Sequence, residues 1–240
     1  MADLITLLRT KDCLVTYCKE YDERWADDEL LENIGLRSGG IFNKRMAEFE
    51  AAGFIQSFIP YGKKVKNHYY RIIDEYTLFY LTWIAKKSIN PIAKHIDDHY
   101  WEVLSTKPAW KAWAGLAFEA ICFKHINQIK KALHIPDGSD ASSWKYISDK
   151  EKESGAQIDL VFDRPDNIVN LCEIKYCSAP FVIDKKVAAH LMSREKIYAK
   201  VTKTNKQLFL SMVVSGGLKK TMYSEELIVS VVTLDDLFKS

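Results

Sequence analysis

Two apolar segments separated by a turn signal constrain this chain more than any other feature of its sequence. Residues 156–163 (AQIDLVFD) and 168–176 (IVNLCEIKY) are rich in Ile, Val, Leu and Phe. The Arg-Pro-Asp-Asn cluster at 164–167, between them, is typical of a turn. The sequence therefore predicts a β-hairpin around which the other elements are arranged.

Three charged residues of this hairpin are expected to meet. Side chains repeat every two residues along a strand, so Glu173 and Lys175 project side by side. A register that sets Asp159 of the first strand opposite Glu173 would bring their Cβ atoms to about 5 Å. Two carboxylates so placed repel each other unless a cation lies between them. Carboxylate oxygens are the ligands that Mg²⁺ and Mn²⁺ prefer, so the pair predicts a metal site.

The predicted metal site depends on the register of the hairpin. A four-residue loop would set Asp159 against Cys172 and send Glu173 to the opposite face of the sheet. A five-residue loop ending at Ile168, or one β-bulge, restores the pairing of the two carboxylates, and bulges are common beside active sites. We expect one of these two arrangements. The alternative is a half-buried pair of strands whose charges merely face solvent.

Composition and charge restrict the class of protein. The chain has 240 residues, 48% of them hydrophobic and 28% charged, which suits one large domain or two small ones. A net charge of +2 means that nucleic-acid binding must rest on local patches. The chain has no apolar run of ~18 residues and no signal-like N-terminus, so we expect a cytoplasmic protein with no membrane partner. Its five scattered cysteines predict neither zinc nor disulfides.

The first 75 residues show the order helix, turn, helix and basic hairpin. Helices are predicted near 14–20, 27–34 and 41–52, with Gly53 as the stop of the third, and strands at 54–60 and 68–73. This order predicts a winged helix-turn-helix domain. The residues expected to contact DNA bases or phosphates are Arg37, Ser38, Asn43, Lys44, Arg45, Lys63, Lys64 and Lys66. The alternative is a module that packs against another domain, its lysines keeping the hairpin tip soluble.

Helices are predicted to fill the middle of the chain. Residues 74–87 form an aromatic-rich helix whose rings we expect in the core, and a short helix follows near 95–104. The longest helical run is predicted at 108–133, with the single acid Glu119 in an apolar segment. A lone carboxylate in such a place is costly unless it reaches water, a partner or a metal.

The C-terminal part is predicted to complete a mixed sheet. Strands are expected at 142–147, 207–214 and 227–233. A helix at 183–202 is expected to cover one sheet face through Val187, Leu191, Ile197 and Val201, and its cations, Arg194 among them, to face water or line a phosphate track. The segment SGGLKKT at 215–221 lacks the spacing of a phosphate-binding loop, so no ATP site is expected within the chain.

The hairpin and its surroundings resemble known families. Asp159 followed by Glu173-x-Lys175 resembles the D…(D/E)xK signature of the PD-(D/E)xK nuclease-like superfamily. The segments AWKAWAGLAFEAICFKHI, GAQIDLVFDRPDNIVNLCEIKY and VVTLDDLF are similar to the C-terminal region of an archaeal-type (AAA-like) ATPase family that is also widespread in bacteria. The GL-x-SGG turn, the GFI before the wing and the YRIIDEY exit resemble that family as well.

The resemblance implies an α+β / α/β chain in three parts. These are a winged-helix domain at 1–75, a helical connector at 76–107 and a PD-(D/E)xK restriction-endonuclease-like domain at 108–240, with a mixed sheet flanked by helices. The ATP-binding domain of the family lies upstream of this region. An ATPase domain upstream or in trans is therefore an expected partner, beside DNA.

The resemblance also implies a metal-dependent DNA endonuclease. Its catalytic residues would be Glu119, Asp159, Glu173 and Lys175, because Glu119 matches the acid of the helix that precedes the core strands. The three carboxylates would hold Mg²⁺ or Mn²⁺ and Lys175 would position the attacking water, with Gln157 and Tyr176 in support. Glu119 would otherwise mark the wet edge of a buried helix. The alternative function is a DNA-binding or regulatory module of an ATPase with an inactive nuclease-like core.

Overall fold

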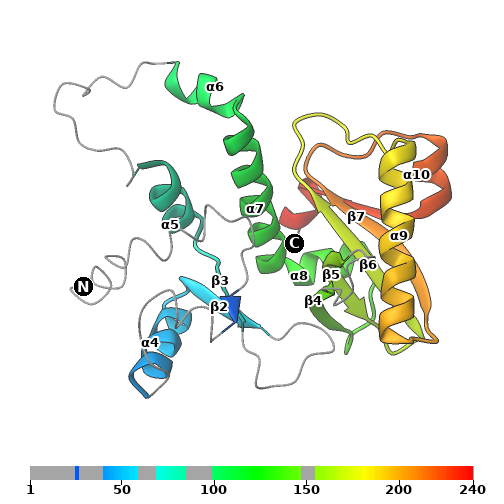
Figure 1. The fold of residues 1–240 in the computed structure, drawn as a ribbon, viewed down its shortest axis with the longest axis horizontal. Coiled ribbons are helices and arrows are strands. Elements are labelled where there is room, and N and C mark those ends of the chain that lie inside the picture. Colours follow the sequence, from blue (N-terminus) through cyan, green and yellow to red (C-terminus); the bar gives the residue numbers. More distant parts are fainter. Residues whose placement is uncertain (1–24, 27–39, 59–68, 85–98, 147–154, 240) are drawn as a thin grey trace. The chain divides into compact units, whose positions relative to one another are not determined.

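The computed structural model describes residues 25–26, 40–58, 69–84, 99–146 and 155–239 (Figure 1). The described chain divides into two compact units, one ending at Ala120 and the other beginning at Ile121. Helix α7 (Pro108–Lys124) contributes to both units. The expected division into three domains stays a prediction.

The first unit contains a helix followed by an antiparallel hairpin. Helix α4 (Gly40–Ala51) leads through Gly53, whose φ is +75°, into β2 (Ile55–Phe58) and β3 (Tyr69–Ile72). The Glu50 carboxylate accepts hydrogen bonds of 2.7 Å from both the backbone N–H and the hydroxyl of Ser57, which ties α4 to β2.

A third strand, β1 (Trp25–Ala26), pairs with the other side of β3 and gives the order β1-β3-β2. Sequence analysis missed β1, because two residues are too short to show alternation. The two predicted helices near 14–20 and 27–34 lie outside the described residues.

Aromatic side chains fill the remainder of the first unit. Helix α5 (Glu75–Phe79) continues into a π-helical turn, η1 (Tyr80–Ile84), and α6 (Tyr100–Ser105) precedes α7. Neighbouring rings lie with centroids 4.9–6.3 Å apart in a cluster of Phe79, Trp83, Trp101, Trp110 and Trp113. Phe79 and Trp83 are half-buried in this cluster, but the expected core placement was wrong for Tyr76 and Tyr80, which are 69% and 41% exposed.

The long helix predicted at 108–133 is interrupted. It consists of α7 and a shorter helix, α8 (Ile126–Ala132). Between them His125 has φ −104° and ψ 28°, and its N–H is shared between the carbonyls of Ile121 and Cys122. The predicted single helix was wrong at this point, because neither Pro nor Gly marks the break in the sequence.

A five-stranded mixed sheet with the order β4-β5-β6-β7-β8 forms the second unit. The strands are β4 (Asp140–Tyr146), β5 (Ala156–Asp163), β6 (Ile168–Lys175), β7 (Gln207–Val214) and β8 (Ile228–Thr233). The first three run antiparallel and the last three parallel. The parallel connections carry α9 (Lys185–Thr202) and α10 (Met222–Leu227), and a 3₁₀ helix, η3 (Asp235–Phe238), follows β8. The predicted mixed sheet flanked by helices is confirmed.

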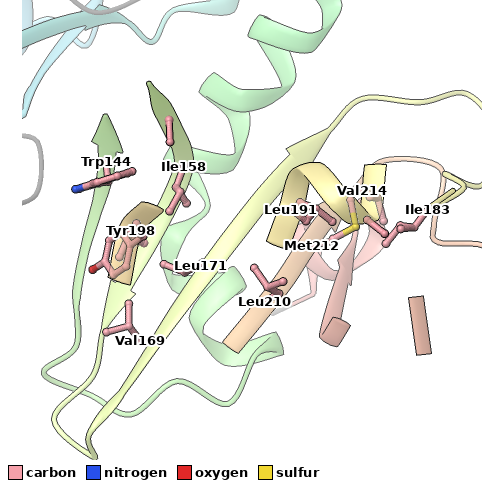
Figure 2. Packing of buried hydrophobic residues seen from close by; sticks show 13 residues of the cluster. Trp144, Ile158, Val169, Leu171, Ile183, Leu191, Tyr198, Leu210, Met212 and Val214 are labelled. Carbon is pink, nitrogen blue, oxygen red and sulfur yellow. The ribbon is translucent and has the colours of Figure 1, made fainter. Parts of the chain in front are cut away.

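The core of this unit lies between the sheet and α9. Strand β6 is buried at every residue except its first and last, as expected for a central strand covered on both faces. Figure 2 shows Leu191 and Tyr198 of α9 in the same cluster as Leu171, and the rings of Tyr198 and Trp144 lie 5.1 Å apart. The predicted inward face of α9 was partly wrong, because Val201 is exposed and Tyr198 is the buried side chain near that end of the helix.

Candidate functional site

The register of the β5–β6 hairpin is the one that the two-carboxylate hypothesis needs. Asp163 pairs with Val169 and Leu160 with Cys172, so five residues form the connection. The five-residue loop expected from the sequence is confirmed. Asp159 and Glu173 are the next residues beyond the last pair, Leu160 and Cys172.

A β-bulge lies at Asp159. In the pairing with β4, Asp159 and Leu160 together oppose the single residue Ser143. The pairing with β6 ends at Leu160, and beyond it the Asp159 carboxylate accepts a 3.0 Å hydrogen bond from the backbone N–H of Ile174. The bulge therefore removes Asp159 from regular alternation and turns its carboxylate toward the neighbouring strand.

Glu173 is a buried carboxylate held between two cations. Its side chain is only 9% exposed. The Lys175 ammonium lies 2.6 Å from Oε1, and the Arg194 guanidinium, which comes from α9, lies 2.5 Å from Oε2. Both carboxylate oxygens thus take part in charge-assisted hydrogen bonds, which are the strongest kind in proteins.

The charge of Lys175 is stabilised by its surroundings. Burial lowers the pKa of Lys175, but the nearby carboxylates of Glu173 and Asp159 outweigh that effect, and the pKa is raised above its ordinary value. The raised pKa favours the protonated form of Lys175 at neutral pH, so its ammonium supplies a positive charge beside the two carboxylates. The same attraction shows that both carboxylates lie near its ammonium.

The cluster is electrically balanced without any further ion. Asp159 and Glu173 carry two negative charges, and Lys175 and Arg194 carry two positive ones. No group of three or more His, Cys, Asp or Glu side chains arranged to hold a metal occurs among the described residues. Mg²⁺ usually takes only one or two protein carboxylates beside waters and substrate phosphates, so Asp159 and Glu173 suffice in number. Each oxygen of Glu173 accepts one hydrogen bond and keeps a lone pair for such an ion, although the ion would repel Lys175 and Arg194.

A small pocket adjoins this cluster, between α9 and the sheet. Its charged lining residues are Glu173, Arg194 and Glu195, and the other lining residues are mostly apolar: Ile158, Leu171, Cys172, Leu191, Leu210, Ser211 and Ile228. Burial raises the pKa of Glu195, against a smaller opposing effect of Lys196. The Glu173–Arg194 ion pair is part of the pocket wall, so separation of the pair would change the shape of the pocket.

The remaining predicted catalytic residues lie elsewhere. Glu119 is half-buried on α7 within the first unit, whereas Asp159 and Glu173 belong to the second, so their meeting stays a prediction. Gln157 is half-buried on β5, and Tyr176 directly follows β6 with 49% of its surface exposed. Their supporting roles also stay predictions.

Only part of the predicted DNA-contacting set is described. Asn43 and Lys44 are exposed on α4, where the Lys44 ammonium lies 4.0 Å from the carboxylate of Glu48, and Arg45 belongs to the same helix. The other five residues lie outside the described chain: Arg37, Ser38, Lys63, Lys64 and Lys66.

Arg194 is the member of the cluster that the sequence analysis did not assign to the site. It was grouped with the solvated cations of its helix, yet it contacts a buried carboxylate and is only 25% exposed. Its spacing offered a signal, because it lies three residues after Leu191 and four before Tyr198, on the buried face of α9.

Comparisons of the chain with known proteins found no relative. No family model matches the chain, and searches of curated proteins and of solved structures found no match. Among the described residues, no helix is both long and apolar enough to cross a membrane.

Proposed function

We propose that this chain is a metal-dependent DNA endonuclease of the PD-(D/E)xK type, similar to the C-terminal region of archaeal-type ATPases. The observation that carries the proposal is the placement of Asp159, Glu173 and Lys175 around one point near the carboxyl end of β6. The register supports it, since Asp159 and Glu173 directly adjoin the last paired residues, Leu160 and Cys172. The electrostatics support it too, because both carboxylates act on the Lys175 ammonium.

The side chains have distinct roles in this proposal. Asp159 and Glu173 would hold Mg²⁺ or Mn²⁺, which when bound polarises a phosphate and lowers the pKa of water. Lys175 remains protonated, donates a hydrogen bond to the attacking water and offsets the negative charge that grows on the phosphate. Glu119 would add a third carboxylate, with Gln157 and Tyr176 in support.

DNA binding is assigned to the N-terminal part as a winged helix. The order of α4, β2 and β3, with β1 completing an antiparallel sheet, supports that assignment. The exposed side chains of Asn43 and Lys44 leave α4 able to contact a groove or a phosphate. An ATPase domain upstream or in trans would then be the partner that directs the nuclease.

The test is cleavage of supercoiled plasmid by the purified chain in Mn²⁺ or Mg²⁺, with EDTA as the blank. Asp159→Asn and Lys175→Met should each abolish nicking, by about 100-fold or more for the loss of electrostatic stabilisation. Glu226→Gln and Lys186→Met remove the same charges from exposed positions and should cleave like the wild type. Equal nicking by all five proteins would assign the activity to a contaminant.

One observation favours the alternative, a regulatory module with an inactive core. Both oxygens of Glu173 are already occupied by Lys175 and Arg194, and the cluster needs no metal for charge balance. In that case the chain would bind DNA or an ATPase domain with unchanged affinity in EDTA, and no metal would support nicking.

A further inference from the structure

Arg194 holds its carboxylate partner through one end of its side chain. Its Nη1 atom lies 2.5 Å from Oε2 of Glu173, and this is its one ion pair or hydrogen bond within the described part of the chain. A guanidinium carries five N–H donors in a planar fork. With a quarter of its side chain exposed beside the pocket, Arg194 has donors available for a second, anionic group.

A divalent ion on Glu173 would compete with two cations for one negative charge. Lys175 lies at Oε1 and Arg194 at Oε2. Each oxygen has a second lone pair, so a divalent ion can bind there, but its two positive charges would repel both cations and favour the departure of one. Lys175 lies two residues away on the same strand, so its position is set by the sheet. Arg194 reaches Glu173 from a different element, on a longer side chain, and is the partner more easily exchanged.

The charge balance determines what a released Arg194 would bind. The cluster is neutral with its four side chains, so a divalent ion leaves an excess of two positive charges. A phosphodiester restores part of the balance, and Arg recognises phosphate oxygens through two parallel hydrogen bonds. Metal and phosphate would then favour each other's binding, and such coupling is reciprocal.

We propose that Arg194 binds phosphate. Without metal it is paired with Glu173, and a divalent cation bound by Glu173 releases it. Metal binding and nucleic-acid binding are therefore coupled. This inference deepens the proposed function and rests on its metal site. It assigns to Arg194 the contact with the phosphate backbone next to the bound ion.

Direct binding measurements on the full chain test this coupling. Mn²⁺ binding is followed by electron paramagnetic resonance without DNA, and binding of a short DNA duplex is measured with and without Ca²⁺. Arg194→Gln should bind Mn²⁺ more tightly than the wild type, because the competitor for Glu173 is gone. Ca²⁺ should tighten duplex binding about fivefold or more in the wild type and much less in the variant.

Two further variants separate this role from general effects of charge and folding. Lys196→Gln removes one positive charge from an exposed position of the same helix and should behave as the wild type. Arg194→Lys keeps the charge without the fork, so it should retain wild-type Mn²⁺ affinity but lose much of the coupling. Unchanged or weaker Mn²⁺ binding by Arg194→Gln, or full coupling in Arg194→Lys, would overturn the inference.

Plasmid nicking distinguishes failure of this inference from failure of the proposed function. If Arg194→Gln loses the coupling and the wild type does not nick plasmid, the role of Arg194 is supported and the proposed nuclease activity is rejected. If the wild type nicks plasmid in a metal-dependent way and Arg194→Gln keeps the coupling, the nuclease proposal is supported and the proposed role of Arg194 is rejected. Absence of Mn²⁺ binding in both proteins overturns both.

Discussion

Glu173 shows how a single buried charge organises its neighbours. A carboxylate that is 9% exposed in a central strand is costly to bury without partners, and Glu173 has one on its own strand and one on a helix. The ion pair to Arg194 is therefore also a link between α9 and the sheet. The sequence could predict Asp159, Glu173 and Lys175, whose spacing is fixed by two adjacent strands. It could not predict Arg194, because a pairing between helix and sheet depends on how α9 packs.

Replacing Glu173 should therefore be costly for folding. Glu173→Ala leaves Lys175 and Arg194 partly buried next to each other without a counter-charge. We expect a loss of about 2–3 kcal/mol in the free energy of unfolding, somewhat below the value for fully buried pairs because both cations retain some exposure. Urea denaturation measures it. The double variant Glu173→Ala with Arg194→Gln should lose less than the sum of the two single losses, and an additive effect would contradict a direct ion pair.

The contribution of Lys175 to the free energy of unfolding should decrease at alkaline pH. Its pKa is raised in the folded protein above the ordinary 10.5, so the protonated form is favoured by folding. The stabilisation is complete below pH 10.5 and decreases as the pH rises through the higher folded pKa. The difference in urea midpoint between the wild type and Lys175→Met should thus be constant from pH 7 to about 10 and shrink above that. A difference that already shrinks near pH 8 would contradict a raised pKa.

Loops at the ends of β6 and β7 keep the site in place at the scale of elements. The backbone N–H of Ser215 donates to the carbonyl of Lys175, and its hydroxyl donates to the carbonyl of Cys177. Phe181 and Gly217 are joined by a further backbone hydrogen bond of 2.8 Å. These hydrogen bonds tie the two loops together, and the backbone at Lys175 is held by their close approach.

Gly216 makes that approach possible. A Cβ atom at this position would lie 2.6 Å from the carbonyl oxygen of Ala179 and 2.8 Å from that of Cys177, both of them backbone atoms. Gly216→Ala should therefore lower the free energy of unfolding by about 1–3 kcal/mol, as overpacking does. Gly115→Ala is the matched control, since it lies within α7 with open space around it and should stabilise by about 0.5–1 kcal/mol. Equal effects in urea denaturation would contradict this geometry.

Helices and strands could be predicted where the local sequence pattern determines their ends. Strands β5 and β7 have the predicted bounds, because each is an apolar run closed by turn residues. The break at His125 and the π-helical turn η1 have no such mark, since packing and not local sequence decides them. The five-residue loop between β5 and β6 was one of two arrangements expected from the sequence, whereas the bulge at Asp159 lies in the pairing with β4 and was not predicted.

The division into two units is the main property of the whole molecule. The sheet, α9 and α10 lie within the second unit and have a core of their own. The boundary falls inside α7, so a fragment designed to contain the second unit should begin at Pro108, the first residue of this helix. The sequence did not predict the boundary between the units after Ala120, because the helical pattern of α7 continues across it. For the same reason it did not predict which unit Glu119 belongs to.

A fragment from Pro108 to the end of the chain should fold by itself. We expect it to unfold cooperatively in urea and to bind Mn²⁺ as the full chain does, since Asp159, Glu173, Lys175 and Arg194 are all present. Its affinity for a DNA duplex should fall at least tenfold, because the proposed winged helix is missing. Circular dichroism and Mn²⁺ titration measure folding and binding, and a fragment without a cooperative transition would show that the second unit depends on the first.

The hydrogen bond from Ile174 to Asp159 makes one backbone amide in the middle of the sheet a reporter on the site. In an ordinary ladder this N–H would donate to a backbone carbonyl, which neither titrates nor binds metal. Here its acceptor is a carboxylate proposed as a metal ligand. The hydrogen-exchange rate and amide chemical shift of Ile174 should therefore change when Asp159 is protonated or takes an ion, while amides of β7 change little. Occupancy of the site can thus be followed in solution at one amide, with no substrate present.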